Sequence, residues 1–518
     1  MSRKPRSANE KLAAALSAAK AAAGGGGVFG SAIVSRGDLE TLLAGGWVKE
    51  MYAGWYALAQ PTSNDGETVS YYANYWEFLA KYLQDRLGED YTLDPASSLE
   101  VHADNRTIPS TITVQTSRTT RAVVNLKHGL TLLIYNTSDF DPGHTVEKEG
   151  IRLQSVEKAL SKLPVSIFRN PSPALLATIA SVRNVPELSR LLLTDRNQAG
   201  AGRIVAALRL AGRPREADLI KHDFAAGGFA VKEDQELNEL VFGNVVSSAE
   251  SSPLAGRLIA AAKMFGLQAN EMSIPAPAFD FRALPFKFTK TKIQEIYVHD
   301  AYNSLSIEGY QVSEELIEKI ASGEWDPVTK DTDGRARDAM AARGYFDAFG
   351  SVLLSLEKIH GGDDVVETLK NDFQDWRRQL FGQSVRAGIL PASALAGYRN
   401  EPVYIRGSAH VPPAKGRLMD AMDALFVCLA REENPWIRAM IGHFLFVFIH
   451  PFPDGNGRVG RFLMNALLLS GGYPWVVVRV SGREKYMAAL ENASVHNDFR
   501  DFIALMKEEM NVGGDATR

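Results

Sequence analysis

Two apolar stretches separated by a short polar turn constrain this chain more than any other feature. Residues 437–449 and 462–469 are predominantly apolar, and each predicts a buried helix. The turn between them is His-Pro-Phe-Pro-Asp-Gly-Asn-Gly-Arg-Val-Gly-Arg, residues 450–461. Its reactive side chains should therefore lie on a loop between two core helices and at the start of the second helix.

The turn has the chemistry of a phosphate site. Gly455 and Gly457 flank Asn456, and glycine lets successive backbone N–H groups point into one concavity that binds anions. This concavity should open into a helix start, whose unpaired N–H groups and dipole also favour negative charge. Arg458 and Arg461 are spaced to share one helix face, where both guanidiniums can bind phosphate oxygens. The pattern favours a di- or triphosphate.

Two further residues of the turn predict catalysis. Asp454 is its lone carboxylate, and Mg²⁺ usually takes one or two carboxylates together with substrate phosphates. His450 is the natural base, since an ordinary histidine is largely neutral at neutral pH and can accept a proton from a hydroxyl. Each residue alone also has an ordinary structural explanation, such as a packed histidine or a solvated arginine. Their combination favours a site.

The whole turn resembles the signature of the Fic family, His-Pro-Phe-x-(Asp/Glu)-Gly-Asn-Gly-Arg-x-x-Arg, at every specified position. Most members of that family are protein adenylyltransferases, which move AMP from ATP to a Ser, Thr or Tyr hydroxyl of a protein and release pyrophosphate. The resemblance implies ATP as substrate, Mg²⁺, His450 as the catalytic base and Asp454 as the metal ligand. It implies these phosphate-binding residues: Gly455, Asn456, Gly457, Arg458 and Arg461.

Relatives that transfer phosphate or another nucleotide part usually depart from the motif at its glycines or its second arginine. This chain keeps Gly457 and Arg461, which favours AMP transfer. The pocket for the nucleotide base lies outside the motif, and Tyr486 and Asn492 are its candidates.

An upstream segment, residues 397–413, resembles the flap of the same family. Its centre alternates apolar and polar residues, as a short exposed strand does: Val403, Tyr404, Ile405 and Arg406. An exposed strand edge can hold a target segment by β-augmentation, which would set the target hydroxyl over the nucleotide. An ordinary edge hairpin is the alternative.

Residues 304–309, Ser-Leu-Ser-Ile-Glu-Gly, resemble the inhibitory pattern of the family, (Ser/Thr)-x-x-x-Glu-(Gly/Asn). The resemblance implies an inhibitory helix around 295–309, ahead of the core, with Ser304, Glu308 and Gly309 as its inhibitory residues. Glu308 would pair with Arg461 and take the place of the ATP γ-phosphate, where a carboxylate repels the nucleotide and removes its cation. So short a pattern can also arise by chance. In some relatives the same glutamate positions water for AMP removal, so both directions stay open.

The N-terminal residues predict a different module. Residues 9–22 form an alanine-rich helix pattern, followed by a short helix and a hairpin that turns at Ala53-Gly54. This arrangement resembles the winged helix at the start of abortive-infection antitoxin-like regulators. Basic residues that could contact DNA phosphates are Arg3, Lys4, Arg6, Arg36 and Lys49. Acidic residues that weaken such a footprint are Asp38, Glu40 and Glu50. DNA binding and protein contacts are both open.

The fold expected is multidomain and mostly α. We predict a winged helix-turn-helix-like domain over residues 1–65, an α+β domain over 66–150 and a helical region over 151–271. A Pro-rich linker, 272–278, then leads to an all-α Fic core with a β-hairpin flap over 279–518. A chain of 518 residues is long enough for two or three such domains.

Composition limits the remaining classes. The net charge of −4 neither demands nor excludes a nucleic-acid partner. Cys428 is the single cysteine, so no disulfide can form within the chain. No apolar stretch of ~18 or more residues predicts a membrane span, and no apolar signal-peptide core follows the N-terminal basic residues. We expect a cytoplasmic protein without a membrane partner.

Two functional classes compete. The first is an adenylyltransferase that modifies a target protein, with its own chain and a homodimer as further partners to consider. The second is a DNA-binding, antitoxin-like transcriptional regulator whose Fic core is a self-modification switch. The intact motif makes the first class primary.

Overall fold

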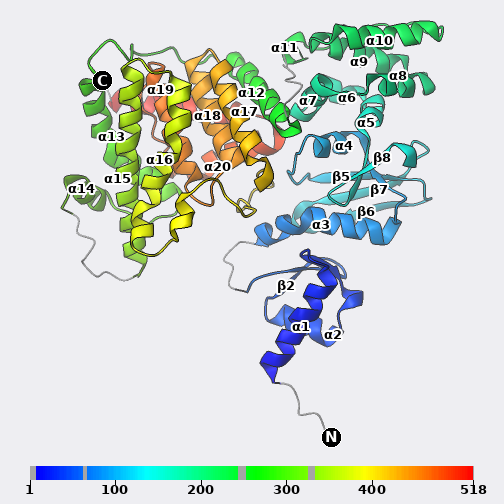
Figure 1. Ribbon diagram of the computed structural model, residues 1–518, viewed down its shortest axis with the longest axis horizontal. Coiled ribbons are helices and arrows are strands. Elements are labelled where there is room, and N and C mark those ends of the chain that lie inside the picture. The colour runs from blue at the N-terminus through cyan, green and yellow to red at the C-terminus, as the bar shows by residue number, and fades with distance from the viewer. Residues whose placement is uncertain (1–6, 62–66, 243–251, 325–332, 517–518) are drawn as a thin grey trace. The chain divides into compact units, whose positions relative to one another are not determined.

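The computed structural model describes residues 7–61, 67–242, 252–324 and 333–516, which form two compact units (Figure 1). Unit 1 consists of Met1–Ala249 together with Tyr404–Pro412. Unit 2 consists of Glu250–Val403 together with Pro413–Arg518. The chain therefore enters unit 1 twice, the second time through a short segment taken from the middle of unit 2.

Unit 1 begins with two helices and a small antiparallel sheet. The elements are α1 (Ala8–Ala23), β1 (Val28–Gly30), α2 (Arg36–Ala44), β2 (Val48–Tyr52) and β3 (Trp55–Leu58), with strand order β1-β3-β2. Ser7 and Glu10 form a capping box that starts α1, and Gly24 ends the helix with φ 63°. The predicted first helix and the hairpin at Ala53-Gly54 are confirmed. The basic residues Arg3, Lys4 and Arg6 lie outside the described residues.

The α+β part of unit 1 packs one long helix on a four-stranded sheet. The helix is α3 (Glu67–Leu87), and the strand order is β4 (Thr92–Leu93), β5 (Thr111–Thr116), β7 (Thr131–Asn136), β6 (Arg121–Asn125). Only the β5–β7 pair is parallel. Tyr75 and Phe78 of α3 share a buried core with Ile112 and Leu132 of the sheet. The remaining elements are α4 (Pro95–His102) and a hairpin of β8 (Thr145–Lys148) and β9 (Ile151–Gln154).

A helical region completes unit 1. Its helices are α5 (Val156–Lys162), α6 (Val165–Arg169), α7 (Pro173–Ser181), α8 (Val185–Thr194), α9 (Gln198–Leu210), α10 (Pro214–Ala226) and α11 (Glu239–Phe242). Several of the arginines that recur along it are ion-paired, for example Arg169 with Asp234 at 3.1 Å and Arg209 with Glu233 at 3.0 Å. This part of the chain therefore presents a charged surface whose signs offset each other.

Unit 2 is built from helices. They are α12 (Pro253–Glu271), α13 (Phe286–Ile307), α14 (Glu314–Ser322), α15 (Asp333–His360), α16 (Val365–Arg386), α17 (Leu418–Arg431), α18 (Pro435–Ile449), α19 (Asn456–Ser470), α20 (Arg483–His496) and α21 (Arg500–Ala516). α18 and α19 pack on each other; α12 and α17 pack against α18, and α15 and α16 against α19. Both central helices are buried along almost their whole length, so the loop joining them is held on both sides by the core.

The predicted boundary at the Pro-rich residues 272–278 is wrong. α12 belongs to unit 2, because Phe265 is fully buried and its ring packs on Phe444, Phe499 and Phe502. The Pro-rich stretch is not a free linker either, since the Ala278 N–H donates to the Gly472 carbonyl at 2.8 Å. The two units divide at residues 249 and 250 instead. The prolines do mark a break between two helices, α12 and α13, but both helices belong to unit 2.

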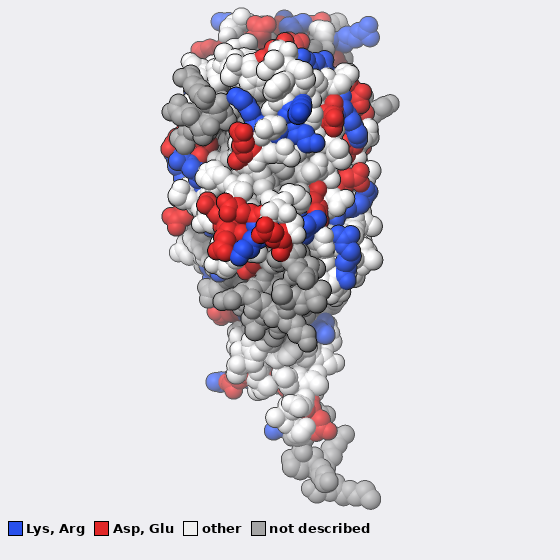
Figure 2. Space-filling model, turned by 90° about the vertical axis from the view of Figure 1, so that its left-hand side faces the viewer, with Lys and Arg blue, Asp and Glu red and all other residues white. Residues whose placement is uncertain are grey.

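Surface charge is mixed. On the face turned to the viewer in Figure 2, basic and acidic side chains are interspersed, and its described part shows no continuous basic surface. Among the residues that the structure describes, no helix is long and apolar enough to cross a membrane.

The assignment of α12 to unit 2 can be tested by substitution. Phe265→Ala should lower the free energy of unfolding by about 3–5 kcal/mol, because it leaves a cavity among three aromatic rings. Phe288→Ala is the matched control, since Phe288 is 58% exposed and its loss should change the free energy little. Denaturant unfolding followed by fluorescence measures both. Equal stability of the two variants would contradict the packing described for α12.

Candidate active site

The loop between α18 and α19 carries the residues that the sequence singled out. α18 ends at Ile449, and His450 follows with a left-handed backbone of φ 52° and ψ 57°. Gly455, with φ 85°, precedes the first residue of α19, Asn456. A side chain at 455 would be strained at this angle. Because α19 begins before residue 462, Arg458 and Arg461 both lie on the helix, as predicted.

Asn456 closes the loop. Its Oδ1 accepts a hydrogen bond from the Phe452 N–H at 2.9 Å, and its Nδ2 donates to the Phe452 carbonyl at 2.8 Å. The residue is 2% exposed. Both ends of its amide are therefore used inside the protein. The expectation that the Asn456 side chain would orient phosphate does not match this structure, and the backbone N–H groups at the start of α19 are the better anion donors.

Arg458 is a buried cation held by the loop. Its Nη2 donates to Asp454 Oδ1 at 3.2 Å, and its guanidinium lies 5.0 Å from the ring centre of Tyr310 and 5.1 Å from that of Phe381. Its Nε is buried without a hydrogen-bond partner among the described atoms. Two aromatic faces and one carboxylate thus hold this positive charge beside the turn.

Arg461 is bound by the end of α13. Its Nη2 donates to Glu308 Oε1 at 2.8 Å and to the Ser304 carbonyl at 3.0 Å, while its Nε donates to Ser304 Oγ at 2.9 Å. Glu308 follows the last residue of α13, and Gly309 takes φ 88° directly after it. Ser304 and Glu308 of the predicted inhibitory pattern therefore contact the motif at Arg461, and Gly309 follows them in the turn after the helix.

The Glu308 carboxylate lies on the first turn of α19. A Cβ placed on Gly457 would come within 2.1 Å of Glu308 Oε1. Only a glycine at 457 allows this approach. The carboxylate therefore occupies the place to which the helix N-terminus would attract an anion.

This contact also pairs the buried Arg461 guanidinium with a partly exposed carboxylate. Burial alone would lower the pKa of Arg461, but the Glu308 carboxylate, together with Tyr486 and Tyr345, more than offsets burial and raises the pKa above its ordinary value. A buried arginine without its partner would need another anion, because leaving such a charge unpaired is costly. The same geometry can therefore accept either the protein's own carboxylate or a phosphate oxygen.

His450 has the properties of a base. Its Nδ1 lies 3.3 Å from the Val447 carbonyl. A carbonyl only accepts, so Nδ1 carries the hydrogen and Nε2 has the free lone pair. Burial lowers the pKa of His450 and the Arg399 guanidinium lowers it further, against the opposing effect of Val447, Glu308 and Asp454. The ring is therefore neutral near neutral pH.

Arg399 is a residue that the sequence reasoning missed. It is 3% exposed, and its side chain donates to three carbonyls: His450 at 2.8 Å, Glu401 at 3.2 Å and Pro413 at 2.5 Å. Its own N–H donates to the Pro451 carbonyl at 2.9 Å. It therefore joins both ends of the 401–413 segment to the loop of His450. An arginine beside a polar turn usually has a solvated side chain, so the sequence pattern did not indicate that Arg399 would hold this loop.

Asp454 fits a metal only in part. Its Oδ1 accepts from the Gly455 N–H at 2.6 Å and from Arg458, and its side chain is 55% exposed. Within the described ranges no group of three or more His, Cys, Asp or Glu side chains could hold an ion. Asp454 therefore fits as the single protein ligand of an ion whose other ligands are water and substrate phosphates.

The predicted flap has a different local structure. Val403, Tyr404, Ile405 and Arg406 form no strand. The Ser408 N–H instead turns back to the Ile405 carbonyl at 3.1 Å, and Gly407 has φ 77°. The alternating pattern favoured a β-hairpin, but Pro402 lacks an N–H and the turn at 407 comes too early for a paired strand.

The two candidates for the base pocket lie in different surroundings. Tyr486 is buried beside Arg461 and hydrogen-bonded to His443 Nε2 at 2.7 Å; burial raises the pKa of Tyr486 to about 12. Asn492 donates to Asp501 of α21 at 2.9 Å. Tyr486 is thus brought to the motif, and the Asn492 amide is bonded to α21.

The part of the chain that includes this loop is similar to known proteins. Residues 368–468 match the model of the Fic/DOC family. A relative named "Protein adenylyltransferase Fic" from Nematostella vectensis is 30% identical over 218 residues, 41% of this chain and 47% of that protein. One of the same name from Culex quinquefasciatus is 30% identical over 220 residues, 42% of this chain and 40% of that protein. The chain spans about half or less of these curated relatives.

Solved structures are more distant. Fic-1 from C. elegans, residues 134–508, is 18% identical with a TM-score of 0.36, covering 70% of this chain and 90% of its own. A Fic domain containing signaling protein from Bacteroides thetaiotaomicron is 14% identical with a TM-score of 0.38, covering 50% and 95%.

The electrostatic effect of Arg399 on His450 can be measured directly. Arg399→Met should raise the pKa of His450, because it removes a positive charge that disfavours the protonated ring. Arg399→Lys keeps a positive charge while losing the same planar set of hydrogen bonds, so its His450 should titrate closer to the parent. NMR titration of the His450 ring measures both variants, with circular dichroism to establish folding. Identical titration in the parent and the Met variant would contradict the effect.

Proposed function

We propose that this chain is a protein adenylyltransferase, because residues 368–468 match the model of the Fic/DOC family. The reaction would move AMP from ATP to a Ser, Thr or Tyr hydroxyl of a protein. One observation carries the proposal: a neutral histidine at the end of the loop adjoins a helix start that favours anions, and two buried arginines lie in the first turns of that helix. The relatives named protein adenylyltransferase Fic support the same activity.

In this reaction the protein's groups divide the work. His450 Nε2 accepts the proton of the target hydroxyl, whose oxygen forms a bond to the α-phosphorus. The bond from that phosphorus to the β-phosphate oxygen breaks, and pyrophosphate leaves. The N–H groups at the start of α19 hold the phosphates, and Arg458 adds its positive charge from its place beside Asp454. These groups act by positioning and by stabilising negative charge.

Asp454 would supply the protein ligand of Mg²⁺, and that ion would neutralise phosphate charge. Tyr486 is the better supported candidate for the nucleotide pocket, because it lies beside Arg461.

We further propose that the enzyme is autoinhibited. Glu308 holds Arg461 and covers Gly457, so the terminal phosphate of ATP and the Glu308 carboxylate would compete for one place. A population with Glu308 displaced would bind ATP productively. A factor that binds this population more tightly would activate the enzyme. The Glu308 carboxylate also acts electrostatically on His450, whose pKa it raises against the effect of burial. Orientation of water by this carboxylate for AMP removal is part of the proposal.

The regulator alternative has less support. Arg36 of α2 is paired with Glu40 at 2.9 Å, and Lys127 lies 3.6 Å from Glu50 of the hairpin, so these cations are partly offset. Five predictions from the sequence remain proposals: a winged helix, DNA binding, self-modification, a homodimer and a cytoplasmic location. Salt-dependent retention of the whole chain on duplex DNA would favour the regulator.

Releasing Arg461 should activate transfer. In Glu308→Gly, label from α-labelled ATP should appear on protein at least about tenfold faster than in the parent, because removal of one competing carboxylate contact frees ~1.4 kcal/mol or more for phosphate. Glu324→Gly is the matched control, since Glu324 is exposed and its variant should keep the parent rate. The assay uses cell lysate as the source of targets. An unchanged rate in Glu308→Gly would reject autoinhibition.

The base can be tested in the activated background. Adding His450→Ala to Glu308→Gly should reduce α-label transfer by about 100-fold or more, whereas adding His496→Ala, at an exposed histidine, should not. ATP binding by both double variants, measured by calorimetry, separates a chemical defect from misfolding. Full transfer by a folded, ATP-binding His450→Ala variant would overturn the base assignment. Protein label from γ-labelled ATP would indicate phosphate transfer instead.

A further inference from the structure

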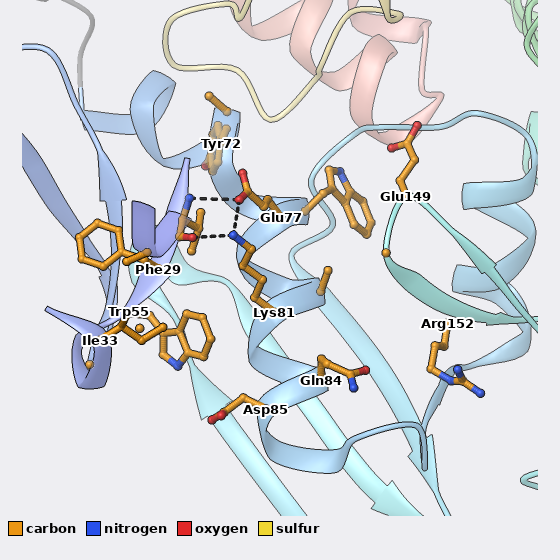
Figure 3. Close-up of a pocket in the computed structure, with 18 of the residues that line it drawn as sticks. Phe29, Ile33, Trp55, Tyr72, Glu77, Lys81, Gln84, Asp85, Glu149 and Arg152 are labelled. Atoms are coloured by element: carbon orange, nitrogen blue, oxygen red, sulfur yellow. Dashed lines mark hydrogen bonds and ion pairs between the residues drawn. The ribbon is translucent and has the colours of Figure 1, made fainter. Parts of the chain in front are cut away.

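A groove of about 1130 Å³ lies along α3 in unit 1 (Figure 3). Phe29, Ile33 and Trp55 line it on the side of the small N-terminal sheet, and Glu149 and Arg152 line it on the side of the β8–β9 hairpin. Side chains of α3 form its floor. We call this feature the α3 groove.

The floor of the groove is held rigidly by its own hydrogen bonds. Glu77 accepts from the Gly27 N–H at 2.8 Å and from the Val28 N–H at 3.1 Å. Lys81 donates to the Ala23 carbonyl at 2.8 Å and to the Val28 carbonyl at 2.7 Å. Figure 3 shows Glu77 and Lys81 side by side at this junction. Because Glu77 and Lys81 are hydrogen-bonded within the protein, they fix the shape of the groove. Other lining residues would have to bind a ligand.

The remaining charges make the groove acidic. Arg106 is paired with Glu149. Asp85, Glu89 and Glu147 also line the groove and are exposed, and none of the three forms an ion pair with another residue that the structure describes. Arg152 is the only lining cation besides Lys81 and Arg106 among the described residues. The three carboxylates therefore outnumber Arg152, and the groove has a net negative charge.

Aromatic rings accompany these carboxylates. Trp55, Tyr72 and Trp76 line the same groove and are partly exposed. Rings together with carboxylates attract lysine and arginine side chains, through cation–π contacts and through charge. The groove is therefore suited to a cationic partner and unsuited to a nucleic-acid backbone.

The groove continues onto the segment predicted as the flap. Tyr404 and Val411 belong to unit 1 and line the groove. The Ile108 N–H donates to the Ala409 carbonyl at 2.8 Å, the Gly407 N–H donates to Thr68 Oγ1 at 3.3 Å, and the Tyr404 hydroxyl donates to the Ala73 carbonyl at 3.4 Å. Val411 is part of the core of unit 1. A chain lying in the groove would therefore meet the flap segment without a gap.

We propose that the α3 groove is a docking site for the target polypeptide, and that it takes a basic segment flanking the modified hydroxyl. This inference rests on the proposed transferase function, because the segment that lines the groove continues at both ends into residues that Arg399 joins to the loop of His450. It assigns to unit 1 a share in substrate selection. Charge complementarity and the continuous surface from the groove to Tyr404 carry the assignment.

The test uses fluorescent threonine peptides of three kinds, with flanks of lysine and arginine, of glutamate, or of glycine and serine. Binding to the full chain with Glu308→Gly is measured by fluorescence anisotropy, and α-label transfer to the same peptides is measured in parallel. The basic peptide should bind about tenfold or more tightly than the acidic one, and added salt should weaken that preference.

Charge reversal locates the binding. Asp85→Lys with Glu147→Lys should abolish the preference for the basic peptide, whereas Glu239→Lys, an exposed carboxylate of unit 1 outside the groove, should keep it. Equal binding of all three peptides, or an unchanged preference in the reversed variant, would overturn the groove assignment. The two proposals can fail separately. Self-labelling without peptide selectivity would contradict only the proposal that the α3 groove is a docking site. Selective peptide binding without any α-label transfer would contradict only the proposed transferase function.

Discussion

The contact between Glu308 and Arg461 is the interaction on which the state of this site depends. One carboxylate pairs a buried guanidinium and at the same time lies on the first turn of α19. Because the contact joins α13 to α19 across a sequence separation of 153 residues, the end of one core helix sets the charge at the start of another. The proposed inhibition thus requires no large movement. Displacing a single side chain would exchange one anion for another at the same cation.

Several features hold the loop around His450 in place, and only some of them can be predicted from the sequence. The apolar stretches that flank it, and the glycines that let it turn, produce regular patterns, and α18 and α19 agree with them. Pairing of Glu308 with Arg461 could be anticipated from the resemblance, because a short pattern carries it. Arg399 could not be anticipated, since its partners are backbone carbonyls that any residue provides.

The failures of sequence reasoning share a physical cause. A Pro-rich stretch indicates where regular structure stops but not whether its carbonyls find hydrogen-bond partners. Residues 272–278 therefore predict a linker, although the Pro275 carbonyl accepts from the Tyr473 hydroxyl. Alternation over Val403 to Arg406 predicts a strand only where a neighbouring strand pairs with it, and this segment instead bonds to unit 1. In both places long-range hydrogen bonding, which leaves no local periodicity, decided the structure.

The closed loop at Asn456 has a chemical consequence for the lifetime of the protein. An asparagine followed by glycine is the sequence most prone to lose its amide nitrogen, because glycine does not obstruct attack by the next backbone nitrogen. Here the amide must both donate to and accept from Phe452. An aspartate at this position would put a carboxylate oxygen in place of Nδ2, facing the Phe452 carbonyl, and leave that carbonyl without its donor. Burial at the start of α19 thus protects the Asn456 side-chain amide from deamidation, which would break the hydrogen bonds that close this loop.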